Sequence, residues 1–385
     1  MTRTRVLYVL PPTGKFAGIE RVVDEIANTI AVDYEARFEI AVLHLSDYGD
    51  YAVGPRAYTY LKGSIRGRLH QMGVLRRMIG HGNYDLVVVP QIEPTAIVWL
   101  ACLGLGPRLI LHLHGNPRHE NTHPKAHIIF GVFRMLVLDR LTYVFGTSPK
   151  QLRAFGRDFP GVASHWTPNP VREFPAMERE ARAEDGRVVF VNVGRFCFQK
   201  GQDLIIAAFR DVVRLRPKAR LVLVGYGEEK AGLAAQARDL GIADSVSFEH
   251  HPQDPVRPLA AADVYVSLSR WEGWSLAICE ALRLGLPVVS SDCEFGPSDI
   301  LTDERLGRLV PTEDKAGAVE AMLYYHDNIV AERAFAEFRA AYVARFNVSK
   351  VATEHALALT KAAGRPVAGA PPREAENAWG GRTSA

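Results

Sequence analysis

Two cations in the second half of the chain have the types and spacing to hold a diphosphate. In "VGRFCFQKG" an apolar run ends at Val193, and Arg195 and Lys200 flank the short loop before a helical segment near Gly201. An Arg side chain offers a planar fork of donors, a Lys side chain a compact point charge, and a helix N-terminus a partial positive charge. These groups together suit a diphosphate. The alternative is a pair of surface cations that cap a loop.

Two glutamates follow in "SRWEGWSLAICEALRLGLPVVSSD". Ser275 is expected to cap a helix over residues 276–284, which places Glu272 in the preceding loop and Glu280 inside the helix. A carboxylate among the apolar neighbours of Glu280 is expensive unless it accepts hydrogen bonds, and ribose hydroxyls are suitable donors. Further amides facing the same space are those of Gly273, Trp274 and Ser275. The alternatives are a hydrolytic carboxylate pair, which we discount, and two solvated glutamates, which fit the apolar neighbours poorly.

A glycine-containing turn also follows the first strand, in "VLPPTGKFAGIERVV". A triphosphate loop needs a glycine well before the Gly-Lys pair and a Ser or Thr after it, but Val9 and Phe16 stand there. A dinucleotide fingerprint needs three glycines, whereas this turn has Gly14 and Gly18. The turn therefore predicts only a general anion contact, from the amide of Gly18 at a helix N-terminus. A plain strand-to-helix turn is the alternative.

Elements that could position these residues alternate along the whole chain. Apolar runs predict strands over residues 6–10, 39–45, 85–90, 108–114, 143–146, 188–193, 220–224, 245–249, 262–267 and 287–290. Amphipathic stretches separate them, and a long helical pattern runs from about residue 316 to 363. This alternation predicts an α/β protein with two doubly wound parallel sheets. Because such sheets bind ligands beyond the carboxyl ends of their strands, we expect two domains facing a central cleft.

The charge distribution and the cysteines of the chain indicate which kinds of partner it can bind and in which compartment it acts. Residues 1–165 carry 19 Lys and Arg against 13 Asp and Glu, and the stretch 51–84 has six cations and no acid. That stretch suggests peripheral contact with anionic lipid headgroups, or else a solvated basic face. Nucleic acid is not expected, because no aromatic stacking platform is interleaved with the cations. Four widely spaced cysteines and the lack of a signal peptide predict a cytoplasmic protein. The basic stretch suggests that it is peripheral at the inner face of the cell membrane.

The order of these motifs resembles the retaining glycosyltransferases of family 4. The matching segments are "VGR…KG", "VLVGYGEE", the two glutamates eight positions apart, and "ALRLGLPVVSSD". This resemblance covers about residues 5 to 345 and implies the GT-B fold, two Rossmann-like domains with the active site in the cleft. It departs from the family pattern at Ala17, where a first glycine is usual, at Trp274 and Ser275, and at Asp299, where glutamate is usual. These departures leave the identity of the sugar open.

The resemblance assigns roles to individual residues. Arg195 and Lys200 would neutralise the leaving diphosphate, Glu280 would bind the ribose, and Glu272 the hydroxyls of the transferred sugar. His114, in "LHLHGNP", matches the family's histidine near the donor sugar. The predicted catalytic residues are Arg195, Lys200, Glu272 and His114. The predicted donor-binding residues are Gly18, Gly194, Gly273, Trp274, Ser275, Leu276 and Glu280. No metal site or cofactor is expected, since the donor is itself a nucleotide diphosphate sugar.

These expectations combine into one predicted function. The chain would transfer a hexose-type sugar, with retention, to an acceptor hydroxyl on a lipid-linked glycan of bacterial surface-polysaccharide biosynthesis. An epimerase-type GT-B enzyme and a non-catalytic sugar-nucleotide sensor are the alternatives. The expected domains are an acceptor-side domain at 1–168 and a nucleotide-sugar domain at 169–345. A C-terminal helix at 346–363 is expected to pack back towards the N-terminal domain, before a disordered tail at 364–385.

Overall fold

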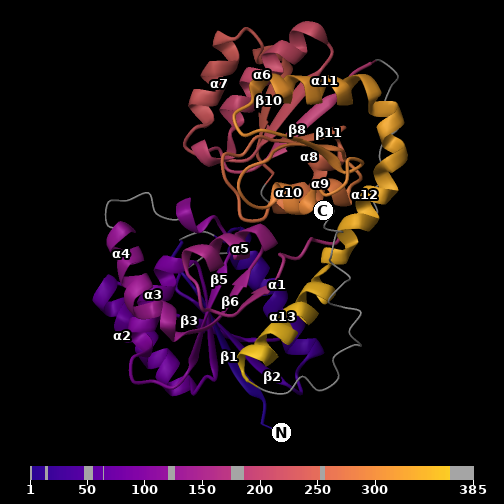
Figure 1. The fold of residues 1–385 in the computed structure, drawn as a ribbon. Helices are drawn as coiled ribbons and strands as arrows, with labels where there is room; N and C mark the ends of the chain where they lie inside the picture. Colours follow the sequence, from indigo (N-terminus) through magenta and orange to yellow (C-terminus); the bar gives the residue numbers. More distant parts are fainter. Residues whose placement is uncertain are drawn as a thin grey trace. The chain divides into compact units, whose positions relative to one another are not determined.

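The computed structural model describes residues 2–13, 16–46, 55–63, 65–119, 126–174, 186–251 and 256–364. The chain divides into two compact units, Met1–Pro170 with Val348–Ala385, and Val171–Asn347. Residues 175–185 and nearly all of the predicted tail, residues 365–385, lie outside the described residues. In both units, helices cover a parallel sheet (Figure 1).

The first unit contains a seven-stranded parallel sheet with strand order β3-β2-β1-β4-β5-β6-β7. Its strands are β1 (Thr4–Leu10), β2 (Phe38–His44), β3 (Thr59–Lys62), β4 (Leu86–Pro90), β5 (Arg108–Leu113), β6 (Leu141–Gly146) and β7 (Ser164–Trp166). The strand order reverses between β1 and β4, so the loops that leave these two strands flank the switch point of the sheet.

Helices cover both faces of this sheet. The longer ones are α1 (Gly18–Asp33), α2 (Arg68–Gly82), α3 (Ile92–Cys102), α4 (Ala126–Val132), α5 (Pro149–Asp158) and α13 (Val348–Ala362). Short turns of helix are η1 (Pro117–His119), η2 (Phe133–Val137) and η3 (Leu138–Arg140). In Figure 1, α13 lies along α1, and α2, α3 and α4 lie together on the other side of the sheet. The terminal helix is thus part of the first unit although it is far from it in sequence.

The second unit contains a six-stranded parallel sheet with strand order β10-β9-β8-β11-β12-β13. Its strands are β8 (Val189–Val193), β9 (Arg220–Val224), β10 (Val246–Glu249), β11 (Val264–Ser267), β12 (Val288–Ser291) and β13 (Gly307–Val310). Its helices are α6 (Gln202–Leu215), α7 (Lys230–Asp239), α8 (Val256–Ala260), α9 (Leu276–Arg283), α10 (Pro297–Ile300), α11 (Lys315–Glu332) and α12 (Ala336–Val343). Short turns are η4 (Phe198–Lys200), η5 (Ala243–Ser245), η6 (Arg333–Phe335) and η7 (Ala344–Phe346).

Apolar side chains explain why these strands lie inside. In β8, Phe190 and Val191 are fully buried, and α6 turns Ile205 and Phe209 into the same core. Both faces of such a strand are covered, which is why the sequence shows continuous apolar runs rather than alternation. The strand order reverses between β8 and β11, and this places the loops that follow these two strands side by side.

All ten predicted strands are present, with ends that differ by at most a few residues. The sequence did not predict β3, β7 and β13, which are short strands at the edges of the two sheets. β3 and β7 are largely exposed or half-buried, so no apolar run marks them. The single helical pattern predicted from about residue 316 to 363 is wrong in one respect, because α11, α12 and α13 are separate helices. Asn347 has extended backbone between η7 and α13 and ends the pattern there.

Candidate functional site

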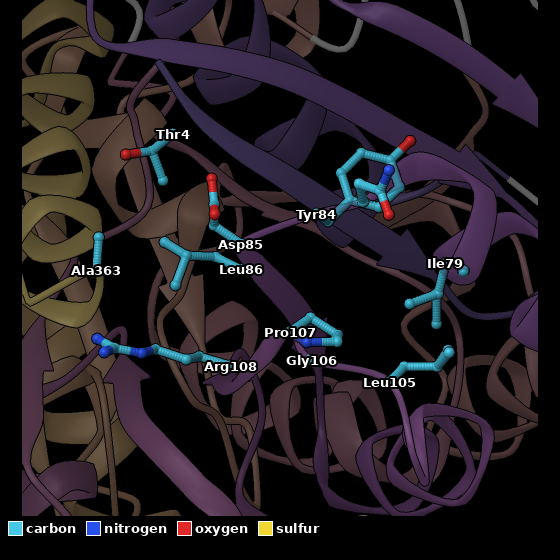
Figure 2. Close-up of a pocket in the computed structure, with 12 residues that line it drawn as sticks. Thr4, Ile79, Tyr84, Asp85, Leu86, Leu105, Gly106, Pro107, Arg108 and Ala363 are labelled. Carbon is cyan, nitrogen blue, oxygen red and sulfur yellow. The ribbon is translucent and has the colours of Figure 1, made fainter. Parts of the chain in front are cut away.

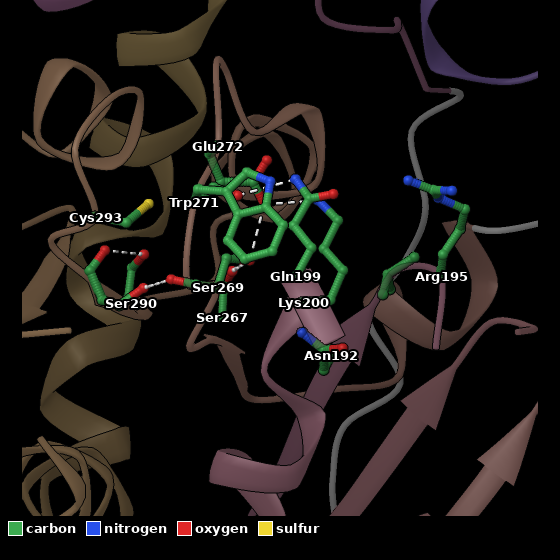
Figure 3. Close-up of polar contacts among 12 residues, drawn as sticks. Asn192, Arg195, Gln199, Lys200, Ser267, Ser269, Trp271, Glu272, Ser290 and Cys293 are labelled. Atoms are coloured by element: carbon green, nitrogen blue, oxygen red, sulfur yellow. Dashed lines mark hydrogen bonds and ion pairs between the residues drawn. The ribbon is translucent and has the colours of Figure 1, made fainter. Parts of the chain in front are cut away.

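Lys200 and Glu272 form an ion pair at the switch point of the second sheet. Lys200 lies in η4 after β8, and Glu272 lies in the loop after β11. The Lys200 Nζ atom is 2.6 Å from Glu272 Oε1, and the glutamate side chain is buried. A buried carboxylate needs compensation, and this ammonium group supplies it. The two residues that the sequence assigned to the diphosphate and to the sugar therefore contact each other directly (Figure 3).

Ser269 adds a second hydrogen bond to the same carboxylate oxygen. Its buried hydroxyl donates to Glu272 Oε1 at 2.8 Å, and the hydroxyl of Ser291 donates to the Ser269 carbonyl at 2.6 Å. Within the described residues Glu272 Oε2 accepts no hydrogen bond. The geometry holds one oxygen of the carboxylate and leaves the other available to a ligand. Ser269 was not predicted from the sequence, although it stands only three residues before Glu272.

Arg195 lies apart from this pair. Its side chain is exposed and makes no hydrogen bond or ion pair with the described part of the chain. Its backbone is held by the buried Gln202, whose Nε2 donates to the Arg195 carbonyl at 3.0 Å and to Asn192 Oδ1 at 3.3 Å. Asn192 in turn donates to the carbonyl of Val266 in β11. The loop that carries Arg195 is thus braced while its guanidinium group faces solvent.

Glu280 lies in α9, buried as the sequence predicted, at 7% exposure. The Nε atom of Arg172 lies 3.8 Å from its Oε1 atom, so a cation compensates this carboxylate too. Ser275 is the N-cap of α9, but its side chain makes no capping hydrogen bond. The predicted donor-binding residues at the start of this helix are buried or half-buried, namely Gly273, Trp274, Ser275 and Leu276. The Trp274 ring packs edge-on against Phe346 at 5.0 Å.

The predicted residues of the first unit lie at the carboxyl ends of its strands. Gly18 is the exposed first residue of α1, which follows β1. Glu20, which was not predicted as a site residue, is buried. Its carboxylate accepts hydrogen bonds from Thr13 Oγ1 at 2.6 Å and from the Ala17 amide at 3.0 Å. Glu20 therefore ties together the two sides of the predicted anion-binding turn, whose Gly14 and Lys15 lie outside the described residues.

His114 follows β5 and belongs to a cluster of buried histidines. Its ring lies 3.9 Å from that of His112, which lies 5.1 Å from that of His355 in α13. Burial lowers the pKa of His114 to about 4, opposed by a weaker hydrogen-bonding effect of Asn169. His114 is therefore a neutral imidazole near neutral pH, a form that can accept or donate a hydrogen bond.

The basic stretch 51–84 is only partly available to a partner. Arg56 lies 3.7 Å from an Asp24 carboxylate oxygen and stacks on the ring of Tyr60. Arg76 donates to two backbone carbonyls at the end of α3. Arg66 and Arg77 are exposed, and the described residues offer their side chains no partner. Among the described residues, no helix combines the length and the apolar character that crossing a bilayer requires.

One cavity of about 390 Å³ lies elsewhere, at the amino ends of β1, β4 and β5. Polar groups of Thr4, Asp85 and Arg108 line it (Figure 2). The Arg108 guanidinium group also donates to the Ala362 carbonyl at the end of α13. None of the predicted site residues contributes to this cavity. It lies at the edge of the sheet opposite the one where parallel sheets bind their ligands.

The segment that contains Lys200 and Glu272 matches a known protein family. Residues 173–337 match the model described as glycosyl transferases group 1. This match covers most of the second unit, which is therefore similar to group 1 glycosyltransferase domains. The matched segment contains Arg195, Lys200, Glu272 and Glu280. The resemblance to glycosyltransferases that was inferred from the sequence is confirmed.

Curated relatives are similar to this chain over different lengths. The lipopolysaccharide core biosynthesis glycosyltransferase LpsE of Rhizobium meliloti is 39% identical over 37% of this chain and 40% of its own. The phosphatidyl-myo-inositol mannosyltransferase of Mycobacterium leprae is 24% identical over 73% of this chain and 74% of its own. For three curated relatives, LpsE among them, the aligned segment spans 29%, 32% and 40% of the relative's length.

Solved structures share the fold of most of the chain. The HepE protein of Anabaena, in complex with UDP and glucose, superposes with a TM-score of 0.75 at 18% identity. The match covers 93% of this chain and all of that one, 100%. The predicted GT-B fold, with two Rossmann-like parallel-sheet domains, is therefore confirmed.

Proposed function

We propose that the protein is a retaining glycosyltransferase that moves a hexose from a nucleoside diphosphate sugar to an acceptor hydroxyl. The observation that carries the proposal is the pairing of Lys200 with Glu272 at the switch point of a group 1 domain. One group suits a departing diphosphate, and the other offers a free carboxylate oxygen to sugar hydroxyls. Support for the donor class comes from HepE, whose structure holds UDP and glucose.

In the proposed reaction the bond between the anomeric carbon and the diphosphate oxygen breaks, and a bond to the acceptor oxygen forms on the same face. The acceptor proton passes to the departing diphosphate. Negative charge therefore grows on the diphosphate, where Arg195 and Lys200 stabilise it. Lys200 has three N–H donors, so it can keep its bond to Glu272 while it contacts a phosphate oxygen. Glu280 would accept hydrogen bonds from the ribose, and His114 would contact the sugar.

The first experiment is a thermal-shift screen of nucleotide sugars, because a bound donor stabilises the folded state by about 2.7 kcal/mol at 100 times its Kd. Turnover is then measured with the stabilising donor and a panel of acceptors, with product configuration assigned by NMR. Arg195→Ala and Lys200→Ala should each lower kcat by about 100-fold or more. EDTA should leave kcat unchanged, since the proposed charge stabilisation comes from the protein.

Lys200→Ala also leaves the buried Glu272 carboxylate without its cation. The control is therefore Glu272→Gln alone and together with Lys200→Ala, which removes the stranded charge. If the double variant regains folding stability but its turnover falls well below that of Glu272→Gln alone, Lys200 acts in the reaction. Full turnover of Arg195→Ala and Lys200→Ala would refute the assignment. Conversion of the donor without any acceptor would favour an epimerase, and binding without turnover a sensor.

We further propose that the acceptor is a lipid-linked glycan, reached by a peripheral contact with an anionic, cytoplasmic membrane face. Two relatives are named for lipopolysaccharide core biosynthesis and for phosphatidyl-myo-inositol mannosylation. The exposed Arg66 and Arg77 are the cations of the basic stretch without a described partner. Replacing both with Gln should weaken partitioning to anionic vesicles by about 2 kcal/mol, or roughly 30-fold.

The matched control replaces Arg153 and Arg157 with Gln. Both are exposed on α5 of the same unit, so the same net charge is removed at another place. Vesicles of phosphatidylcholine alone test whether the attraction is electrostatic, as does added salt. Equal loss of binding in both double variants would refute a localised contact. No binding of the wild type to anionic vesicles would favour a soluble acceptor.

A further inference from the structure

The loop that carries Lys200 and the loop that carries Glu272 are fastened to each other by Arg270. This side chain lies two residues before Glu272 and is only 10% exposed. Its Nη1 atom donates to the Phe198 carbonyl at 2.7 Å, and its Nη1 and Nη2 atoms donate to the two carboxylate oxygens of Asp203 at 2.9 and 2.7 Å. The partners of Arg270 therefore stand on both sides of Lys200 in sequence.

Further contacts of Arg270 fix its own position. Its Nε atom donates to Glu313 Oε1 at 3.1 Å, and its guanidinium carbon lies 3.8 Å from the centre of the Phe198 ring. A guanidinium group that is bidentate to one carboxylate, bonded to a second and stacked on an aromatic ring has little freedom. The planar fork of Arg270 thus reaches all these partners at once.

The backbones of the two loops also bind each other beside this side chain. The Arg270 amide donates to the Gln199 carbonyl at 2.8 Å, and Gln199 Nε2 donates to the Trp271 carbonyl at 2.9 Å. Gly201 has a φ of +63°, and a Cβ atom there would lie 2.0 Å from the Leu268 carbonyl oxygen. The loops are therefore in backbone contact, and small shifts of one would move the other.

We infer that Arg270 is a positioning residue, which holds the Lys200 turn against the Glu272 loop so that the ammonium group meets the departing diphosphate. The inference rests on the proposed function and deepens it. Arg270 itself is bonded to protein groups on four of its N–H donors and touches no reacting atom. Displacing a catalytic group by about 1 Å can lower turnover by about 100-fold, so loss of the clamp should be visible in kcat.

The test compares three variants that break the clamp with one that does not. Arg270→Met removes the fork and keeps an apolar stem, Arg270→Lys keeps the charge without the fork, and Asp203→Asn acts from the partner's side. The control is Arg216→Met, which breaks the bidentate bonds between Arg216 and Asp327 at the other end of α6. That pair has the same chemistry and similar distances, 2.7 and 2.6 Å, and lies outside the two loops.

Two readouts are needed. Hydrogen exchange of peptides that cover residues 196–204 should be about tenfold faster in Arg270→Met and Asp203→Asn, and unchanged in Arg216→Met. With an active donor–acceptor pair, kcat should fall by about 30-fold or more in Arg270→Met, whereas KM for the donor changes by about threefold or less. Arg270→Lys should recover only a small part of kcat, because one ammonium cannot reach both partners.

The outcomes separate this inference from the proposed function. Unchanged exchange in Arg270→Met and Asp203→Asn, or faster exchange with wild-type kcat, would overturn the positioning role. So would an equal loss in Arg216→Met, because a general loss of stability would then explain the result. If the wild type transfers no sugar, the proposed function fails, and the clamp is judged by loop exchange and by UDP affinity. Wild-type loop exchange and wild-type UDP affinity in Arg270→Met would then overturn the positioning role of Arg270.

Discussion

The buried histidine cluster predicts that the first unit loses stability in mild acid. Burial lowers the pKa of His114 to about 4 and that of His355 to about 3, with neighbouring histidines adding to the effect on His355. Burial also holds the pKa of His112 well below its ordinary value. The ring nitrogens of His355 have no hydrogen-bond partner among the described residues. An imidazolium group formed there would therefore be buried without compensation.

The sign follows from proton linkage. A histidine whose folded-state pKa is depressed binds a proton more readily in the unfolded state. Its contribution to stability is therefore present above the unfolded pKa of about 6.5 and is lost as the pH falls towards the folded pKa. At about pH 5, a histidine with a folded pKa of about 4 has lost roughly 2 kcal/mol of stability. His114 and His355 together then account for roughly 4 kcal/mol, a large part of a typical domain's stability.

The assay is urea unfolding between about pH 7 and about pH 5, followed by hydrogen exchange in peptides that cover β5 so that the first unit is observed by itself. His355→Leu removes one of the titrating groups and should reduce the loss of stability over this range by roughly 2 kcal/mol. His70→Leu is the matched control, because His70 is exposed in the same unit. A wild-type protein equally stable at both ends of the range, or a His355→Leu profile parallel to the wild type, would refute the reasoning.

Two further predictions concern the second unit. Arg339 is fully buried, pairs with Glu332, and donates to the carbonyls of Arg305 and Gly285, so Arg339→Ala should lower the free energy of unfolding by about 3–5 kcal/mol. Urea unfolding measures this, and a loss under about 1 kcal/mol would contradict it. Gly201→Ala should cost about 1–3 kcal/mol because of its positive φ and the Leu268 carbonyl. Gly232→Ala in α7, where a Cβ atom meets nothing, is its control in thermal unfolding, and equal melting temperatures of the two variants would count against the argument.

The sequence predicted the buried strands well because both faces of each strand are covered, which produces continuous apolar runs such as "LVVVP" in β4. The edge strands β3 and β7 carry no such run. The residues of β3 are exposed or half-buried, and β7 has three residues. The helical pattern near the C-terminus was read as continuous because periodicity alone does not show where a chain turns. The break before α13 depends on the extended backbone at Asn347.

Motif spacing was enough to select Lys200 and Glu272, but not to show that they contact each other across 72 residues of chain. That contact depends on the pairing of β8 with β11, which sets the two following loops side by side. Arg270 was missed for the same reason. Its partners Phe198 and Asp203 lie in η4 and α6 after β8, and short-range patterns in the sequence do not reveal that strand order brings them close. Ser269, in contrast, bonds to Glu272 only three residues away, so the spacing alone could have revealed it.

The terminal helix shows how far such long-range order reaches. The chain leaves the first unit at Pro170 and returns to it at Val348, and β-bridge contacts between Val171 and Asn347 hold the two crossings together within the second unit. After its return the chain forms α13, whose His355 lies against His112 of β5 and whose Thr353 accepts a hydrogen bond from Tyr34.

The core of the first unit is therefore completed only after the second unit has been made. A fragment that ends at Pro170 would expose the surface that His355 and Leu359 cover, and it would lack one member of the histidine cluster. Since buried apolar area supplies most of the driving force for folding, such a fragment lacks part of its own core. The first unit begins before the second in the chain, but the core of the second unit can be completed first.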